Sequence, residues 1–453
     1  MVDFLIVYEL VQREMENVAL LGAELERRGY CVELVKFPFI NISKLRKKYL
    51  NNVKVVLCQS MYDEAVLHNL VYHIAGKVEK IVNLQWEQIG TVSDEQNNCS
   101  ARMPKGSAKN IPHICWGKRP QEMLINAGMD EKRTVITGPI QMDFLREEFD
   151  SYYKSRAELY KEFEIPSDKK TALFISSLSY TSLDENEIHR LEKALGKEFV
   201  TVFRDVSIRT QRAVLEWIGK ALSEDEELIF IYRPHPAEAG SEILREAQKK
   251  YNRFFVINKY SVKQWIKRCD MIYNWFSTSA AEVHYAGKSA FVLRPVELPE
   301  KYEVALLKDC SFITSYEEFA GSLCEKEGIT VSEERINSYY DVSDVPAYVR
   351  LADFLEKVIK TNEFDYKWSK ETQKFCKSYY RKRVLHISLV NIKVAVLYVI
   401  NSIKKLSGMR FDEYYASFYK KRERSVREIK AEEQRVRNIM REIVKEPAER
   451  SNL

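Results

Sequence analysis

The sequence of 453 residues lacks the cysteine pattern of a disulfide framework or a zinc ribbon. Its eight cysteines are scattered, and no two of them form a Cys-x-x-Cys pair. We therefore expect free thiols in a protein of the reducing cytoplasm. Five of the seven histidines, including His68 and His73, show no metal-ligand spacing and are interpreted as structural. Because His68 and His73 are five residues apart, we expect them on different faces of a helix.

A targeting segment and a clear membrane span are also missing. The stretch Met1–Val7 has the pattern of a strand, with no basic region and no cleavage site of a signal peptide. The strongly apolar stretch Val384–Ile400 is short for a bilayer span and contains His386, Asn391 and Lys393. We expect a cytoplasmic protein with no spanning helix.

Negative charge is scarce in the C-terminal tail. Residues 367–453 hold 22 Lys and Arg against 10 Asp and Glu, about +12, which leaves about −7 for the remainder. A mildly acidic body with a basic appendage is not typical of a nucleic-acid-binding enzyme. Two interpretations of the tail stay open. One is peripheral attachment to an anionic membrane, and the other is a helix that packs on the body or forms a homodimer.

The body alternates short apolar strands with helical segments, a pattern that predicts parallel, doubly wound sheets. The pattern occurs twice, which predicts two Rossmann-like α/β domains that face a cleft, followed by a basic helical extension. We place the boundaries at 1–150 for the acceptor-side domain, 151–170 for a connector, and 171–330 for the nucleotide-donor domain. Residues 331–366 are expected to be closing helices, and 367–453 the tail.

Two loops of the second domain carry the residues with recognisable chemistry. The apolar run Ile229–Tyr232 ends at Arg233-Pro234-His235-Pro236, which continues neither a strand nor a helix. About forty residues later a second strand ends at Ser277-Thr278-Ser279, followed by Glu282 in an expected helix. Ligands bind at the carboxyl ends of strands in such sheets, so these loops predict a clamp for a diphosphate or a sugar acid.

These motifs resemble those of a known enzyme group. Arg233-Pro234-His235-Pro236 resembles the His-Pro motif of bacterial transferases that use cytidine-activated donors, and Ser277-Thr278-Ser279 resembles their Ser/Thr motif. The group includes sialyl, Kdo and polyol-phosphate transferases of capsule and teichoic acid assembly. The resemblance implies the GT-B fold and a metal-independent transfer without a cofactor, in which the nucleotide-activated sugar is a co-substrate. A surface glycan or lipid-linked molecule would be the acceptor.

The resemblance also implies roles for individual residues. His235 and Arg233 would bind the donor phosphate, and Glu282 would contact ribose hydroxyls. The hydroxyls expected to line the donor site belong to Ser176, Ser177, Ser277, Thr278 and Ser279. No tight Asp-x-Asp pair is present at a strand end to hold a metal. An acidic-acidic-Gly triplet that carries the base in some sialyltransferases is absent, since the sequence has Asp63-Glu64-Ala65 instead.

The catalytic base is therefore left open. Our first candidate is Glu87, at the end of a first-domain strand, with Asp63, Glu64 and Asp143 in reserve. Each feature also has a structural interpretation: a rigid turn at 233–236, a helix cap at Ser277 or Thr278, and solvated or structural acids at Glu282 and Glu87. A UDP-sugar 2-epimerase and a non-catalytic glycan- or nucleotide-binding protein are the alternative functions.

Overall fold

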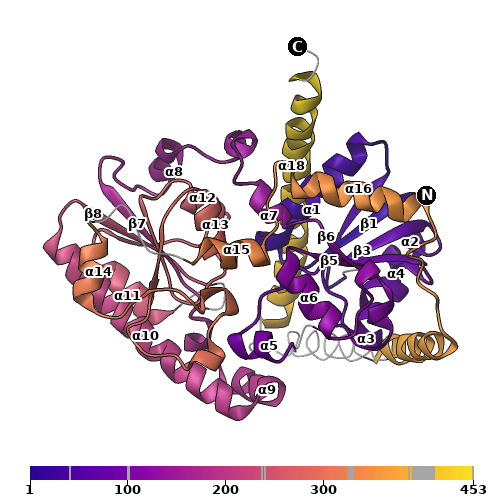
Figure 1. The fold of residues 1–453 in the computed structure, drawn as a ribbon, viewed down its shortest axis with the longest axis horizontal. Coiled ribbons are helices and arrows are strands. Elements are labelled where there is room, and N and C mark those ends of the chain that lie inside the picture. The colour runs from indigo at the N-terminus through magenta and orange to yellow at the C-terminus, as the bar shows by residue number, and fades with distance from the viewer. Residues whose placement is uncertain are drawn as a thin grey trace, which may run out of the picture.

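A computed structural model provides the fold and describes residues 1–39, 42–98, 103–235, 238, 241–324, 331–385, 388–389 and 414–450. Within these residues the chain forms two six-stranded parallel sheets with helices packed against them (Figure 1). The doubly wound α/β fold in two units, with a helical C-terminal region, was predicted from the sequence and is confirmed.

The first sheet has the strand order β2-β1-β3-β4-β5-β6, and every pairing is parallel. Alternate side chains of β1 enter two cores on opposite faces, with Phe4 and Ile6 in one and Leu5 and Val7 in the other. This explains why β1 is a continuous apolar run rather than an alternating one. The strands are β1 Val2–Tyr8, β2 Val32–Lys36, β3 Val53–Cys58, β4 Lys80–Asn83, β5 His113–Cys115 and β6 Thr134–Ile136.

Helices between these strands cover both faces of the first sheet. They are α1 Val11–Arg27, α2 Ile42–Tyr49, α3 Glu64–Leu67, α4 His73–Ala75, α5 Val92–Gln96, α6 Lys118–Asn126 and α7 Ile140–Asp143. Short 3-10 turns are η2 Gly106–Asn110, η3 Glu131–Arg133 and η4 Glu147–Tyr152.

The second sheet has the order β12-β11-β10-β7-β8-β9, again parallel throughout. Its strands are β7 Lys170–Ile175, β8 Leu228–Arg233, β9 Phe254–Val256, β10 Met271–Asn274, β11 Ala290–Leu293 and β12 Phe312–Ile313. The helices and 3-10 turns around it are α8 Arg156–Glu162, η5 Ser179–Ser182, α9 Glu185–Leu195, α10 Lys197–Glu224, α11 Glu242–Lys250, α12 Val262–Ile266, α13 Ala280–Tyr285, η7 Glu300–Tyr302, η8 Ala305–Leu307 and α14 Tyr316–Ser322.

The two halves are joined by an apolar cluster of their own. It combines Ile89 and Trp116 from the first half with Ala281 and Leu306 from the second. The Trp116 ring stacks on the ring of Tyr340, with centroids 5.6 Å apart. Tyr340 follows α15 (Glu333–Tyr339), so the chain crosses back to the first half at this point.

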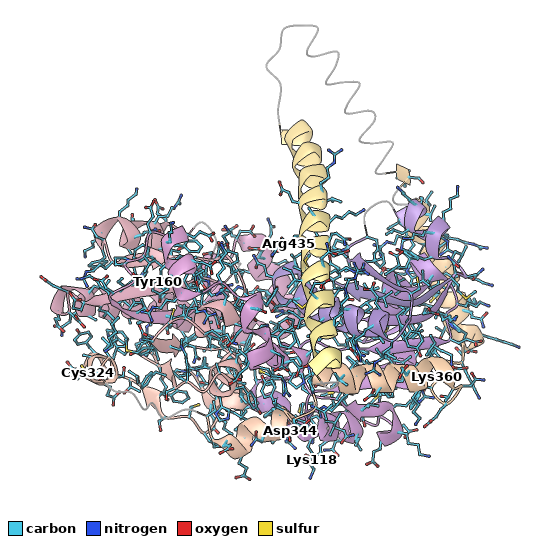
Figure 2. All side chains as sticks on the ribbon, turned by 90° about the horizontal axis from the view of Figure 1, so that it is seen from above. Lys118, Tyr160, Cys324, Asp344, Lys360 and Arg435 are labelled. Carbon is cyan, nitrogen blue, oxygen red and sulfur yellow. The ribbon has the colours of Figure 1, made fainter. Side chains whose placement is uncertain are left out.

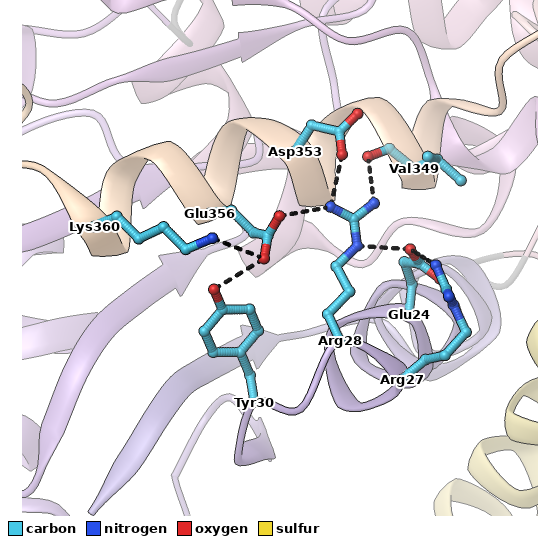
Figure 3. A network of polar contacts seen from close by, with 8 residues as sticks. All are labelled: Glu24, Arg27, Arg28, Tyr30, Val349, Asp353, Glu356 and Lys360. Carbon is cyan, nitrogen blue, oxygen red and sulfur yellow. Dashed lines mark hydrogen bonds and ion pairs between the residues drawn. The ribbon is translucent and has the colours of Figure 1, made fainter.

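Helix α16 (Ala347–Lys360) then packs on α1 through an arginine-centred network (Figure 3). Arg28 donates from Nε to Glu24 at 2.7 Å and from Nη1 to Asp353 at 2.6 Å. It also contacts Glu356 at 3.2 Å, and the Tyr30 hydroxyl donates to the same carboxylate at 2.9 Å. One arginine thus ties the end of α1 to a helix more than 300 residues away in the chain.

The C-terminal tail contributes two separate helical segments. Residues 370–385 form a helix beside the first sheet, and α18 (Tyr414–Arg450) runs along α1 at the junction of the two halves (Figures 1 and 2). At that junction the Tyr8 hydroxyl donates to Glu433 at 2.7 Å. The described part of α18 therefore packs against the body. This agrees with the interpretation of the tail as a helix that packs on the body.

The helix that follows Asp63 departs from the periodicity expected of it. Residues His68–Tyr72 form a π-helical turn between α3 and α4, with one extra residue in the turn. This brings residues five apart onto the same face, so the expectation that His68 and His73 lie on different faces was wrong. Their ring centroids are 5.1 Å apart, and both side chains are buried.

No helix in the described part of the chain is long and apolar enough to cross a membrane. Most of the apolar stretch Val384–Ile400 lies outside the described residues, as do 386–387 and 390–413.

Candidate functional site

The predicted donor loops leave the same edge of the second sheet. Strand β7 lies between β8 and β10, and its last residue, Ile175, pairs with both Arg233 and Asn274. The segments that begin at Ser176, Pro234 and Trp275 therefore start side by side at the carboxyl edge. The His235 loop and the Ser277–Ser279 turn are two strand spacings apart, about 10 Å, with the β7 loop between them.

Arg233 presents a half-buried cation at this edge. Its guanidinium donates to the backbone carbonyls of Lys259, at 3.1 Å, and Tyr260. Burial lowers the pKa of Arg233 to about 10, and the negative charge of Glu16 partly offsets this shift. The side chain remains positively charged at neutral pH, and a guanidinium has five N–H donors, so some remain for an anionic ligand.

His235 is an exposed residue on a loop that is held from beneath. Its backbone N–H donates to Oε1 of Glu238 at 3.0 Å. Desolvation lowers the pKa of the His235 imidazole, and the positive charge of Arg13 lowers it further. The ring is consequently neutral at neutral pH, and it can donate one N–H to a phosphate oxygen.

Glu238 is the centre of a buried network that sequence reasoning did not identify. Its carboxylate accepts hydrogen bonds from Ser176 Oγ at 2.6 Å, the Tyr232 hydroxyl at 2.9 Å and Gln211 Nε2 at 3.3 Å. Burial raises the pKa of Glu238. Ser176 Oγ also accepts the backbone N–H of Leu178 at 3.3 Å and the Tyr232 hydroxyl at 3.0 Å, so this hydroxyl is part of the buried network. Ser177 follows it and is half-buried.

The hydroxyl-rich turn after β10 is also partly used in internal contacts. Ser277 Oγ accepts the backbone N–H of Ser279 at 3.1 Å. The Thr278 hydroxyl forms a hydrogen bond with the Tyr340 hydroxyl. Helix α13, which begins at Ala280, has only six residues.

Glu282 is the buried acid of this turn. Its Oε2 atom is buried and has no hydrogen-bond partner within the protein. Burial raises the pKa of Glu282, and the positive charge of Lys263 opposes that shift. A buried carboxyl oxygen without a partner is costly, so this position suits a ligand that brings its own donors.

The first half contributes Glu87, and the structure places it near the donor loops through Arg13. The Arg13 guanidinium, on the first turn of α1, forms an ion pair with Glu87 at 2.5 Å. The same guanidinium lies near enough to His235 to lower the pKa of the imidazole. Arg13 thus lies near both Glu87 and His235, which were predicted from two different domains.

The three reserve candidates for the base have structural hydrogen bonds instead. Asp63 caps α3 by accepting two backbone N–H groups, and Glu64 accepts the backbone N–H of Ser107 at 2.8 Å. Asp143 accepts the N–H groups of Ala347 and Tyr348 at 3.0 and 2.9 Å, and burial raises the pKa of its carboxyl to about 6. Each carboxylate anchors a turn or a helix start.

A second polar group at the junction was missed because single charged residues on helices give no signal in a sequence. Glu16 of α1 forms a buried ion pair with Lys263 of α12, and it also accepts the Ser261 hydroxyl at 3.2 Å. Two acid–base pairs, Arg13–Glu87 and Glu16–Lys263, therefore lie near the junction. Within the described residues, no group of three or more His, Cys, Asp and Glu could hold a metal ion.

A surface hollow of the second half lies elsewhere. It has a volume of about 620 Å³, is lined by residues of α10 and α11, including Gly219 and Tyr251, and contains none of the predicted site residues. The predicted donor-site residues lie instead at the carboxyl edge of the second sheet.

Comparisons with known proteins bear on the fold alone. No protein-family model and no curated protein matches this sequence. Among solved structures, the wall teichoic acid polymerase TagF, in a form with one histidine replaced by alanine, has 14% identity and a TM-score of 0.51. The match covers 79% of this chain and 89% of TagF.

Two other solved structures have lower TM-scores. S. aureus MnaA, in a co-structure with UDP, has 16% identity and a TM-score of 0.47, over 80% of this chain and 97% of that one. The UDP-GlcNAc 2-epimerase of Methanocaldococcus jannaschii has 12% identity and a TM-score of 0.46, over 78% and 99%. The likeness to TagF supports the GT-B fold: two α/β units with a junction between them.

Proposed function

We propose that this chain is a metal-independent GT-B glycosyltransferase. It moves a sugar, a sugar acid or a polyol phosphate from a nucleotide-activated, cytidine-linked donor to a surface-glycan or lipid-linked acceptor. The observation that carries the proposal is Arg13, which pairs with Glu87 at 2.5 Å and lowers the pKa of His235. A carboxylate from one half and the His-Pro loop of the other therefore face the same space.

In this proposal the donor is held at the carboxyl edge of the second sheet. The Arg233 guanidinium and the imidazole N–H of His235 bind the phosphate, together with the hydroxyls of Ser277, Thr278 and Ser279. Ser176 and Ser177 line the floor between them, and Glu282 accepts hydrogen bonds from ribose hydroxyls. Fixed donors of this kind stabilise negative charge that develops on the leaving nucleotide.

Glu87 is the proposed general base. The acceptor oxygen forms a bond to the transferred group, the bond from that group to the nucleotide phosphate breaks, and the acceptor proton goes to Glu87. Arg13 orients the carboxylate, and it adds a positive charge beside the leaving phosphate. The TagF enzyme, whose fold this chain shares, is a wall teichoic acid polymerase, in keeping with a cell-surface acceptor.

A nucleotide panel tests the donor site. Thermal unfolding is measured with CMP, CDP, UDP and GDP, and cytidine nucleotides are expected to raise the melting temperature. A ligand at a hundred times its Kd stabilises by about 2.7 kcal/mol. Stabilisation by UDP alone would favour a UDP-sugar 2-epimerase, and no response to any nucleotide would contradict the donor site.

A substitution tests the role of His235. His235→Ala removes one donor to the leaving phosphate and is expected to lower transferase kcat by about 100-fold or more, with an unchanged melting temperature. The matched control is His189→Ala, whose side chain is 68% exposed on α9. Equal activity of the two variants would remove His235 from the mechanism.

A further inference from the structure

The structure separates the basic tail into two parts with different surroundings. In α18, the apolar side chains Val436 and Met440 are buried in the first core. Arg437 and Arg441 both pair with Glu26, at 2.5 and 2.7 Å. Both of these arginines are thus ion-paired with the body, and they do not belong to a free basic surface.

The helix at 370–385 is fixed to the body by one face only. Cys376 is fully buried, and the rings of Tyr379 and Tyr380 pack edge-on against His68 and His73, with centroids 4.7 and 5.5 Å apart. This aromatic contact determines which side of the helix faces outward.

The outward side is both apolar and basic. Of the ten large hydrophobic residues that are exposed in the described chain, three lie on this helix: Phe375 (38% exposed), Val384 (41%) and Leu385 (62%). A fourth, Leu389 (57%), lies four residues after the helix. Exposed basic residues are interleaved with them at helical spacing, namely Lys374, Lys377, Arg381 and Lys382. None of these four cations is ion-paired with another residue of the described part.

The charge of the segment is strongly one-sided. Residues 370–385 contain six Lys and Arg and one acidic residue, Glu371, a net charge of +5. A helix with Phe and Leu among Lys and Arg on one face is suited to the interface of an anionic bilayer. A second copy of the same face would bring like charges together, which disfavours self-association through it.

We propose that the outward face of helix 370–385, together with Leu389 beyond its end, docks on an anionic phospholipid surface, with Leu385 and Leu389 inserted and the lysines and Arg381 at the headgroups. The attachment element is therefore this helix and not α18, although both belong to the basic tail. Because the helix packs against the first half, docking would hold that half at the membrane, where, on the proposed function, lipid-linked acceptors reside.

Co-sedimentation of the full-length protein with vesicles tests this surface. Vesicles that contain phosphatidylglycerol are compared with pure phosphatidylcholine, and binding is expected only to the former and to weaken as salt is raised. The double variant Lys374→Glu/Arg381→Glu is expected to bind at least about tenfold more weakly, and Leu385→Ser/Leu389→Ser is expected to lose binding likewise.

The matched control changes the same charges on the other tail helix. Arg427→Glu/Lys430→Glu lies on exposed positions of α18 and is expected to retain full vesicle binding. An equal loss in both charge-reversal variants, or no binding of the unaltered protein, would overturn the proposal.

Sedimentation velocity distinguishes a protein partner. If the leucine variants change the oligomeric state and leave vesicle binding intact, the face is a self-association surface and the proposal is wrong. None of these measurements involves a nucleotide, so a failed donor panel leaves this result unaffected, and the reverse also holds.

Discussion

Glu238 illustrates how a single buried carboxylate can hold a functional loop in place. It has no exposed surface, and it accepts hydrogen bonds from a strand end, a strand tyrosine, a long helix and the backbone N–H of His235. No cation is among the groups that shift its pKa, so the carboxylate is stabilised by neutral donors. The position of His235 therefore depends on Glu238, which is not itself one of the proposed donor-binding residues.

We expect Glu238→Ala to destabilise the protein by about 2–5 kcal/mol, because it leaves the hydroxyls of Ser176 and Tyr232 buried without their acceptor. Urea unfolding measures the change, and nucleotide affinity should fall with it as the loop loses its anchor. The control Glu242→Ala lies on an exposed position of α11 and should change stability by less than about 0.5 kcal/mol. Similar effects of the two substitutions would contradict the anchoring role.

At the scale of elements, the π-helical turn at His68–Tyr72 creates a contact that an α-helix could not make. It brings two histidines to one face, and the helix at 370–385 packs on them through Tyr379 and Tyr380. Arg46, on α2, and Arg383, on the helix at 370–385, lie close enough to lower the pKa of both histidine rings. The contact is consequently one between neutral imidazoles and aromatic rings.

This contact predicts a stability that depends on pH. Burial lowers the pKa of both histidines from 6.5 to about 4, so the unfolded chain binds more protons between those values. Stability is therefore complete above about pH 6.5, and each histidine costs about 2–3 kcal/mol as the pH falls toward 4. His73→Gln should flatten the pH dependence of the melting temperature, whereas His189→Gln on the exposed face of α9 should leave it unchanged. A slope unaffected by His73→Gln would refute the assignment.

At the scale of the whole molecule, Glu16 and Lys263 form a buried ion pair between the halves. Their side chains are 8% and 5% exposed, and they come from α1 and α12. Desolvation is repaid in such a pair only while both partners are present. The relative placement of the two sheets, and with it the crevice, depends on this contact and on the apolar cluster around Trp116.

We expect Lys263→Met to destabilise the protein by about 3–5 kcal/mol, because Glu16 becomes a buried charge without a partner. The double variant Glu16→Gln/Lys263→Met should recover most of the loss, as measured by the urea midpoint. The control Lys118→Met removes an exposed pair with Glu122 at 3.8 Å and should cost no more than about 1 kcal/mol. If Lys263→Met lowered the stability no more than Lys118→Met does, the junction would not depend on the pair.

The candidate site was only partly accessible from the sequence. Arg233, His235 and Ser277–Ser279 were found because each follows an apolar run that ends at residues unable to continue a strand, which is a local signal. Arg13, Lys263 and Glu238 were missed because each is an isolated charged residue with no distinctive neighbours. The histidine pair was misjudged because the extra residue of a π-turn leaves no mark on hydrophobic periodicity.

The sequence by itself determined the order of strands and helices, the doubly wound fold and the loops at the carboxyl edges. These depend on apolar runs, turn residues and the topology rules of parallel sheets, which operate over short stretches of chain. Only the tertiary structure decided that Arg13 pairs with Glu87 and lies near His235, that α18 packs along α1, and that helix 370–385 presents an exposed basic face. Such contacts join residues up to about 400 positions apart, and their free energy comes from burial and pairing that exist only after the chain has folded.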